Sequence, residues 1–538
     1  MANTSAAAAP GLPSTDSAGT FLGHPKGLFV LFFAEMWERF SYYGMRALLI
    51  FYLVKHWAFS DGEGSIIYGA YTALVYITPV VGGYLADRYL GQRKAVLFGA
   101  ILLTLGHFFM AFEGDGSLGQ DNPMMSVFWL ALALIIVGSG FLKANISVIV
   151  GQLYTRTDIR RDPAYTIFYM GINLGAALGS LLCGYIGETY GWAYGFGLAG
   201  FGMLAGLIVF IWGKPLLLGR GEAKNPARLK EKVAGISVEW WMYVAGFALV
   251  GLCWLAIQNQ ALVGYVLGGF GGALVLYVIF IAVVRLPAED RDRIFAALFL
   301  ILTSIIFWAL FEQAGSSLNL FTDRHVDRGG VPASVFQSIN AIYIIMLAPI
   351  FAIVWTWLGQ KGMEPSAPLK FGLGVVQVGL GFLVLVWGAE AVGLDVPVPV
   401  ILIFLIYLLH TTGELCLSPV GLSAMNRLAP THMASLIMGT WFFASAAGNF
   451  AAGLIAQATG GEGLEGAEAG KEVVLGVYET VGLFAVGVGV AVMIISPLIK
   501  KLMHLDTLAD DDVDHALAGE AGLAEPQAAG VNTTTETR

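Results

Sequence analysis

The stretch Glu35-Met36-Trp37-Glu38-Arg39-Phe40-Ser41-Tyr42-Tyr43-Gly44 decides how this chain folds, because it places charges inside an apolar segment. That segment runs from about 27 to 54 and is long enough to cross a bilayer as a helix. Its four charged residues are Glu35, Glu38, Arg39 and Arg46. On a translocon scale each charge near the bilayer centre costs about 3 kcal/mol. The helix must therefore turn these side chains toward protein or water.

Helical spacing gathers the polar residues of this segment into one stripe. Glu35, Arg39, Tyr42 and Arg46 follow i, i+4, i+7 and i+11, and Glu38 lies one turn before Tyr42. Ion pairs that only hold helices together would explain any single member. Two carboxylates, two guanidiniums and two phenols on one helix are better explained by a solute pathway.

The composition is that of a polytopic membrane protein. Of 538 residues, 57% are hydrophobic and 12% are charged, which is far from soluble globular proteins. Most of the net charge of −9 comes from the tail after Leu505, so nucleic acid is not expected as a partner. Three cysteines fall in predicted spans at no metal-ligand spacing, so we expect neither a metal site nor a disulfide. Residues 1–25 lack the basic region and apolar core of a cleavable signal peptide.

Fourteen apolar runs have the length of a membrane span. They lie at about 27–54, 66–86, 95–112, 125–150, 164–187, 192–213, 238–258, 261–284, 293–321, 333–358, 371–393, 397–419, 432–457 and 473–499. Loops on the side of the termini hold twenty-one basic residues, and loops on the other side hold four. This asymmetry predicts that both termini are cytoplasmic.

An internal repeat divides the chain into two six-helix halves. Leu90-Gly91-Gln92-Arg93-Lys94 is echoed by Leu358-Gly359-Gln360-Lys361-Gly362 at an offset of 268, and Lys143 by Glu414 at an offset of 271. The predicted parts are a cytoplasmic tail (1–25), a six-helix bundle (26–213), a linker (214–237), an extra helix pair (238–284), a second six-helix bundle (285–504) and an acidic cytoplasmic tail (505–538). Repeated halves with polar residues at the midplane are typical of alternating-access transporters.

Two of these parts carry further expectations. In the extra pair, Gly264, Gly268 and Gly272 recur at i, i+4 spacing, which favours close helix contact. The linker and the acidic tail have the composition of solvated segments.

Several motifs resemble those of one transporter family. The pattern Glu-x-x-Glu-Arg-Phe-x-Tyr-Tyr-Gly from Glu35 to Gly44 is similar to the first-helix signature of the proton-dependent oligopeptide transporters, a branch of the major facilitator superfamily. Gly83–Arg93 resembles the loop motif of that superfamily, and Phe168–Asn173, Asn340 and Trp441 with Ser445 also match. The resemblance covers nearly the whole chain. It implies an all-α membrane protein with the major facilitator fold, to which the extra pair would add two helices for fourteen in all.

The resemblance also implies residue roles. In that family the equivalents of Asn173, Asn340 and Glu414 hold the peptide amino terminus. The equivalents of Arg39, Lys143 and the signature tyrosines take the carboxylate. Two departures, Ala144 in place of a proline and Gly175-Ala176-Ala177 in place of Gly-Ser-Leu, remove no functional side chain.

The residues lead to a similar site without the resemblance. Cations from one half and a carboxylate from the other suit a small zwitterion, and a dipeptide spans about 7 Å between its ends. The substrate-binding residues we expect are Arg39, Tyr42, Tyr43, Arg46, Tyr76, Lys143, Asn173, Trp308, Glu312, Asn340, Glu414, Trp441 and Ser445. Tyr76, Asn173, Asn340 and Ser445 are placed by the resemblance alone. The five aromatic residues would line side-chain pockets, with ordinary helix packing as the alternative.

The charged residues also predict proton coupling and gating. Buried carboxylates near cations can change protonation as their partners come and go. The residues we expect to take part in proton coupling are Glu35, Glu38, Arg39, Lys143, Glu312 and Glu414. The sequence does not decide which of the acids carries the proton. Arg46 with Glu312 would close an outer gate or act as a static brace. Lys143 needs a partner from another helix, namely Glu35, Glu38 or Glu414, and the repeat favours Glu414 as a second gating pair. His410 is either a relay or a core histidine.

The sequence thus predicts a proton-coupled symporter that imports di- and tripeptides across a bacterial inner membrane, as a monomer among membrane lipid, with protons as coupling ion and no cofactor. A carrier of another solute and a peptide sensor that does not translocate remain alternatives. A membrane-embedded hydrolase is disfavoured, since the chain has neither His-Glu-x-x-His nor Gly-x-Ser-x-Gly.

Overall fold

The computed structural model describes residues 13–155, 158–430, 433–460 and 470–505. Twelve helices in this part of the chain are long and apolar enough to cross a membrane. The two remaining predicted spans also form long helices, α1 (Lys26–Phe51) and α15 (Ala434–Thr459). Each of the fourteen predicted spans therefore contains one long helix, although the span predicted at 293–321 continues past Phe311 into two short helices. The protein is an integral membrane protein.

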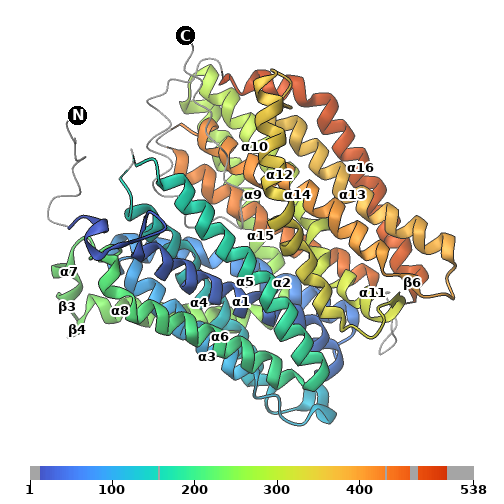
Figure 1. Cartoon of the computed structure of the whole chain (residues 1–538), viewed down its shortest axis with the longest axis horizontal. Coiled ribbons are helices and arrows are strands. Elements are labelled where there is room, and N and C mark those ends of the chain that lie inside the picture. The colour runs from blue at the N-terminus through green and yellow to red at the C-terminus, as the bar shows by residue number, and fades with distance from the viewer. Residues whose placement is uncertain (1–12, 156–157, 431–432, 461–469, 506–538) are drawn as a thin grey trace.

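The long helices form two bundles (Figure 1). The first bundle contains α1, α2 (Asp61–Leu85), α3 (Gln92–Met110), α4 (Met125–Gln152), α5 (Arg161–Tyr190) and α6 (Trp192–Trp212). The second contains α10 (Ala288–Phe311), α12 (Ser338–Gln360), α13 (Ala367–Val392), α14 (Ile401–Leu428), α15 and α16 (Lys471–Leu502). Between them in the chain come α8 (Val238–Ile257) and α9 (Gln260–Arg285). This is the major facilitator fold with an inserted helix pair.

Short elements connect the long helices. The helical ones are η1 (Thr15–Ala18), η2 (Tyr52–His56), η3 (Ala86–Leu90), η4 (Gly116–Asp121), η5 (Lys214–Leu217), α7 (Pro226–Lys230), η6 (Glu312–Gly315), α11 (Ser317–His325) and η7 (Ala333–Gln337). Two antiparallel strand pairs join β1 (Thr20–Phe21) to β2 (His24–Pro25) and β3 (Lys232–Val233) to β4 (Ile236–Ser237), and β5 (Val326–Asp327) pairs in parallel with β6 (Val398–Pro399).

Glycines on α5 let this helix lie directly on the charged helix α1. A Cβ at Gly175 would collide with the carbonyl oxygen of Met36, and a Cβ at Gly179 would collide with that of Phe40. Small residues at a helix crossing allow the backbones to approach closely in a membrane. The contact fixes the rotation of α1, and with it the direction of the polar stripe.

The substitution Gly175→Leu should separate α1 from α5 and destabilise the first bundle. Overpacking of a tight contact costs about 1–3 kcal/mol, so we expect a clear fall in the melting temperature of the purified protein. Gly197→Leu on α6 is the matched control, because a Cβ there meets nothing within 4 Å. Equal melting temperatures for the two variants would contradict this account.

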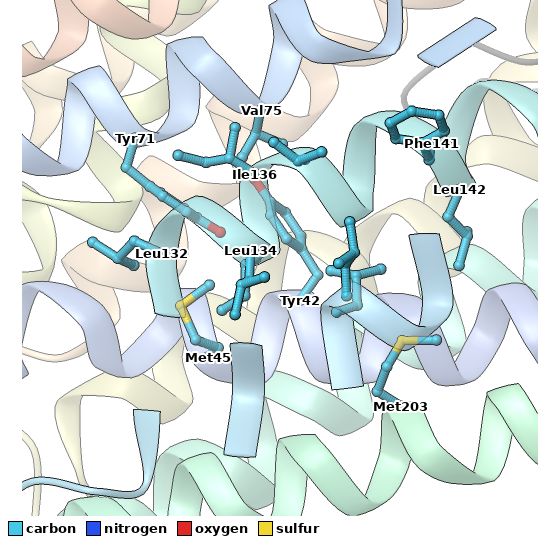
Figure 2. Close-up of a cluster of buried hydrophobic side chains, with 14 of the residues drawn as sticks. Tyr42, Met45, Tyr71, Val75, Leu132, Leu134, Ile136, Phe141, Leu142 and Met203 are labelled. Atoms are coloured by element: carbon cyan, nitrogen blue, oxygen red, sulfur yellow. The ribbon is translucent and has the colours of Figure 1, made fainter. Parts of the chain in front are cut away.

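A continuous apolar core fills the first bundle beside the polar stripe. Figure 2 shows the Tyr42 ring of α1 lying among Val75 of α2 and Ile136 of α4, with Tyr71 and Met45 nearby. All five side chains are almost completely buried. Because such a core is close-packed, we expect the bundle to move as a rigid body.

The two bundles meet closely at one end, which we call the outer end, where α1 ends and α2 begins. There α2 packs on α15, and a Cβ at Gly69 would lie 2.6 Å from the Cα of Gly453. Ion pairs join Lys55 to Asp323 at 2.6 Å and Arg324 to Asp61, whose Nη2 and Oδ1 atoms are 2.8 Å apart. The outer end is therefore closed in this structure.

The inserted helices cover the seam between the bundles. α8 packs on α4, while α9 packs on α15 and α10. The predicted glycine contact face is wrong: Gly264 and Gly271 meet the rings of Phe450 and Phe443, whereas a Cβ at Gly268 or Gly272 would meet nothing within 4 Å. Gly264 and Gly271 are seven residues apart, about two helical turns, so they lie on the same face of α9, and that face packs against rings of α15.

The linker after α6 is mostly exposed over residues 214–237, as expected of a solvated segment, but its part around Gly221 docks on the first bundle. The Gly221 backbone N–H donates to Gln152 Oε1 at 2.7 Å, and the Gly221 carbonyl accepts from the Arg93 N–H at 2.8 Å. The Arg93 guanidinium pairs with Glu222 at 2.5 Å. Paired backbone groups fix this segment where composition alone favoured solvent. The acidic tail after Leu505 lies outside the described residues.

Candidate functional site

On α1, two carboxylates share one guanidinium. Arg39 Nε lies 2.7 Å from Glu35 Oε1 and 3.4 Å from Glu38 Oε2. The three residues are between 0% and 3% exposed. Neither oxygen of Glu38 has a hydrogen-bond partner within the described residues. A proton on one of the two acids would leave a balanced pair, so this cluster can hold a proton.

Lys143 on α4 faces an aromatic ring. Its Nζ lies 3.8 Å from the centre of the Tyr42 ring and 5.9 Å from that of Tyr76. Within the described part of the chain no carboxylate lies at ion-pair distance, so the partner expected from Glu35, Glu38 or Glu414 is in fact Tyr42. A cation–π contact out of water contributes about 2 kcal/mol. Lys143 is half-buried.

Arg46 links the two bundles at the outer end. Its Nη2 contacts Glu312 Oε2, and its Nε donates to the Tyr68 hydroxyl at 2.5 Å. Both charged residues are buried, at 6% and 3% exposed. The structure thus brings the expected pair together, while its role as a gate stays a prediction.

The Glu414 carboxylate on α14 is held by an amide side chain and not by a cation. Its Oε2 accepts from Asn340 Nδ2 at 3.0 Å, and the same nitrogen lies 3.0 Å from Thr411 Oγ1. Glu414 is 4% exposed, and no described cation pairs with it. Lys143 and Glu414, expected as a gating pair, are therefore separate in this conformation. Each bundle presents one uncompensated charge, of opposite sign.

The other predicted binding residues divide by exposure. Tyr43, Tyr76 and Asn340 are half-buried, and Asn173 has a buried Oδ1 with no partner among the described atoms. Tyr42, Trp308, Trp441 and Ser445 lie in bundle interiors.

The two tryptophans pack within the second bundle. Trp308 stacks edge-on against Phe307 and Phe311, and Trp441 lies over Gly421 and Phe371. In this conformation they pack as core residues, the alternative that the sequence left open. His410 likewise contacts the Val378 carbonyl at 3.1 Å and is a core histidine here.

Sequence reasoning missed two phenols and an ion pair. Tyr68 holds Arg46, and Tyr169, one turn before Asn173, has a buried hydroxyl. The position of Tyr169 in the quoted motif was an available signal. Nothing in the sequence pairs Asp61 with Arg324, which lie 263 residues apart.

The described residues contain no group of His, Cys, Asp or Glu that could hold a metal ion.

Comparison with known proteins agrees with this architecture. The model of the POT family matches residues 93–462. The chain is similar to the peptide transporter YePEPT of Yersinia enterocolitica, at 38% identity over 82% of this chain and 90% of that protein. It is also similar to dipeptide and tripeptide permease B of Salmonella typhimurium, at 30% identity over 91% of this chain and 99% of the relative. A crystal structure of a peptide transporter POT in complex with sulfate superimposes with a TM-score of 0.77 and 35% identity, covering 91% of this chain and 98% of that one. The two-bundle architecture thus has close counterparts among known transporters. The chain belongs to the POT family, a family of transporters and not of enzymes.

Proposed function

We propose that this protein is a proton-coupled symporter that imports di- and tripeptides by alternating access. One observation carries the proposal: Lys143 in the first bundle and Glu414 in the second have no ion-pair partner among the described residues. A peptide zwitterion would supply a carboxylate to the first and an ammonium to the second. The printed names of the two relatives, a peptide transporter and a dipeptide and tripeptide permease, support the same substrate class.

In this proposal the remaining expected residues surround the peptide. Arg39, Tyr42, Tyr43, Arg46 and Tyr76 belong to the carboxylate side with Lys143. Asn173, Asn340 and Tyr169 belong to the amino side with Glu414. Trp308, Glu312, Trp441 and Ser445 would line the pocket in conformations where the second bundle tilts. Protons are the coupling ion, and the acids are Glu35, Glu38, Glu312 and Glu414.

The orientation follows from the basic loops. We place the termini in the cytoplasm and the closed outer end at the periplasm of a bacterial inner membrane, with the chain divided at 26, 214, 238, 285 and 505 and acting as a monomer. The closed outer end and the separated charges fit a state that opens toward the cytoplasm. A proton arriving from outside would neutralise Glu312 or the Glu35–Glu38 pair, release Arg46 or Arg39, and let the outer end open.

The direct test is uptake of labelled dialanine into proteoliposomes. We expect accumulation only with an inward proton gradient, competed by di- and tripeptides and not by free alanine. Binding of dialanine without accumulation under any gradient would instead identify a sensor, and competition by an unrelated solute would identify another carrier.

Substitutions at the two charges should act on opposite ends of the peptide. Glu414→Gln should weaken competition by dialanine about 10-fold or more, because the ammonium loses a charged partner, and it should weaken N-acetyl-dialanine far less. Lys143→Gln should show the reverse selectivity, sparing dialanine amide. Inhibition constants for the three compounds measure this, and identical losses for all three would contradict the assignment of ends.

The ion pair between Asp61 and Arg324 should set how often the outer end opens. Replacing both residues, Asp61→Asn with Arg324→Gln, removes the pair without leaving a buried single charge. We expect about a tenfold rise in labelling of a cysteine placed at Ala47 from the outside, which corresponds to about 1.4 kcal/mol. Neutralising the exposed Glu63 instead should leave the labelling rate unchanged.

A further inference from the structure

A cavity lies at the inner end of the second bundle, opposite the outer end. It holds about 570 Å³ between the ends of α12, α14 and α16 and the start of α13. Three cations, Lys370, Arg427 and Lys500, and one acid, Glu364, line it. Leu505, the last described residue, is also part of the wall. The chain therefore continues from this cavity into its acidic tail.

The cavity carries uncompensated positive charge. Lys370 pairs with Glu364 at 2.5 Å and lies 4.4 Å from the centre of the Trp355 ring. Arg427 and Lys500 form no ion pair within the described residues, and both are exposed. Two cations that share a concave wall attract an anionic occupant.

The internal repeat identifies the corresponding place in the first bundle. The offset of 268 relates Gly91 and Gln92 to Gly359 and Gln360, and the offset of 271 relates Ile149 and Gln152 to Val420 and Ser423. All four members in the second bundle line the cavity.

In the first bundle this place is filled by the linker. Gly221 binds Gln152 and Arg93 through its backbone, and a Cβ at Gly221 would touch Ile149 at 3.0 Å. A Cβ at Gly91 would lie 2.7 Å from the carbonyl carbon of Glu222. At the equivalent Gly359 a Cβ would meet only the Glu364 side chain, at 3.3 Å. The linker therefore fills this place in the first bundle. At the equivalent place in the second bundle, no other segment of the described chain lies against Gly359.

The segments that follow α6 and α16 place an acidic residue at the same distance in sequence from the helix end. Glu222 is the tenth residue after α6 ends at Trp212, and Asp512 is the tenth after α16 ends at Leu502. Asp510, Asp511, Asp512 and Asp514 bring to this position the negative charge that Glu222 brings to Arg93. We propose that the acidic segment 510–514 binds in this cavity against Arg427 and Lys500. The segment would tie α16 to α12 and α14, as the linker ties α6 to α3 and α4.

The test uses the full chain with a bimane label on Val513→Cys, which leaves every acid in place, and with Cys416→Ala to remove the cysteine nearest the cavity. Trp355 lines the cavity and quenches bimane on contact. We expect quenched emission that Trp355→Phe relieves. The pair Arg427→Gln with Lys500→Gln should also relieve it, as should high salt, because the contact is electrostatic and partly exposed.

Two further variants make the outcome decisive. Lys501→Gln is the matched control, since Lys501 is exposed on the same turn as Lys500 but does not line the cavity, and it should leave the quenching unchanged. Replacing Asp510, Asp511 and Asp512 with asparagine removes negative charge from the tail and changes no residue of the described helices. This variant should relieve the quenching. Bimane emission that stays unchanged in the Trp355→Phe variant would overturn the proposal. So would quenching that disappears on adding phosphatidylglycerol to phosphatidylcholine nanodiscs, because lipid headgroups would then be the occupant.

Discussion

Glu38→Gln should abolish proton-driven accumulation of dialanine. Glu38 is 0% exposed, and its oxygens have no hydrogen-bond partner among the described residues beyond the ion pair to Arg39 at 3.4 Å. A glutamine cannot titrate, so a proton carried by Glu38 would lose its acceptor, and Arg39 would keep Glu35 as its only charged partner of the two. We expect the rate of gradient-driven uptake to fall by about 100-fold or more.

Two measurements separate coupling from damage. Exchange of labelled for unlabelled dialanine without a gradient should persist in Glu38→Gln, because the proposed binding residues Lys143 and Glu414 are unchanged. Glu479→Gln, an exposed acid on α16, is the matched control and should accumulate dialanine like the unaltered protein. If Glu38→Gln still accumulates peptide against a gradient, Glu35 or an acid of the second bundle carries the proton instead.

Gly453→Leu should prevent the outer end from closing. Gly453 and Gly69 meet almost backbone to backbone, since a Cβ at Gly453 would lie 2.9 Å from the Cα of Gly69. A leucine there forces α15 away from α2. Overpacking of about 3 kcal/mol would shift the conformational equilibrium by about 100-fold toward outward-open states.

The expected result is near-complete loss of uptake from a protein that still folds. Labelling of a cysteine at Ala47 from the outside should become fast, and the melting temperature should change little because each bundle keeps its own core. Gly476→Leu on α16 is the matched control, because nothing lies within 4 Å of a Cβ there. Slow labelling with lost uptake would mean that the leucine disrupts the fold and not the gate.

Periodicity and charge were sufficient to predict the helices. The fourteen spans and the repeated halves were read from apolar runs and offsets, because a membrane span must be long, apolar and helical to satisfy its backbone. The polar stripe on α1 was predictable for the same reason. Four charges in a span force that helix inward, and the structure places them in the interior.

The partners of those charges required the tertiary structure. Lys143 was expected beside a carboxylate and lies over the Tyr42 ring, because Arg39 already engages Glu35 and Glu38. Glycine spacing on α9 likewise suggested the wrong contact face, since which face packs depends on the rings that α15 offers. Composition could not show that the linker docks on the turn between α2 and α3, because that docking uses backbone hydrogen bonds.

The sequence by itself therefore determined that this chain is a two-bundle membrane transporter whose first helix carries charge inward. Only the tertiary structure decided which charges are paired and which lack an ion-pair partner among the described residues. The physical reason is that burial is set by periodicity along one helix, whereas an ion pair such as Asp61 with Arg324 depends on how two bundles approach one another.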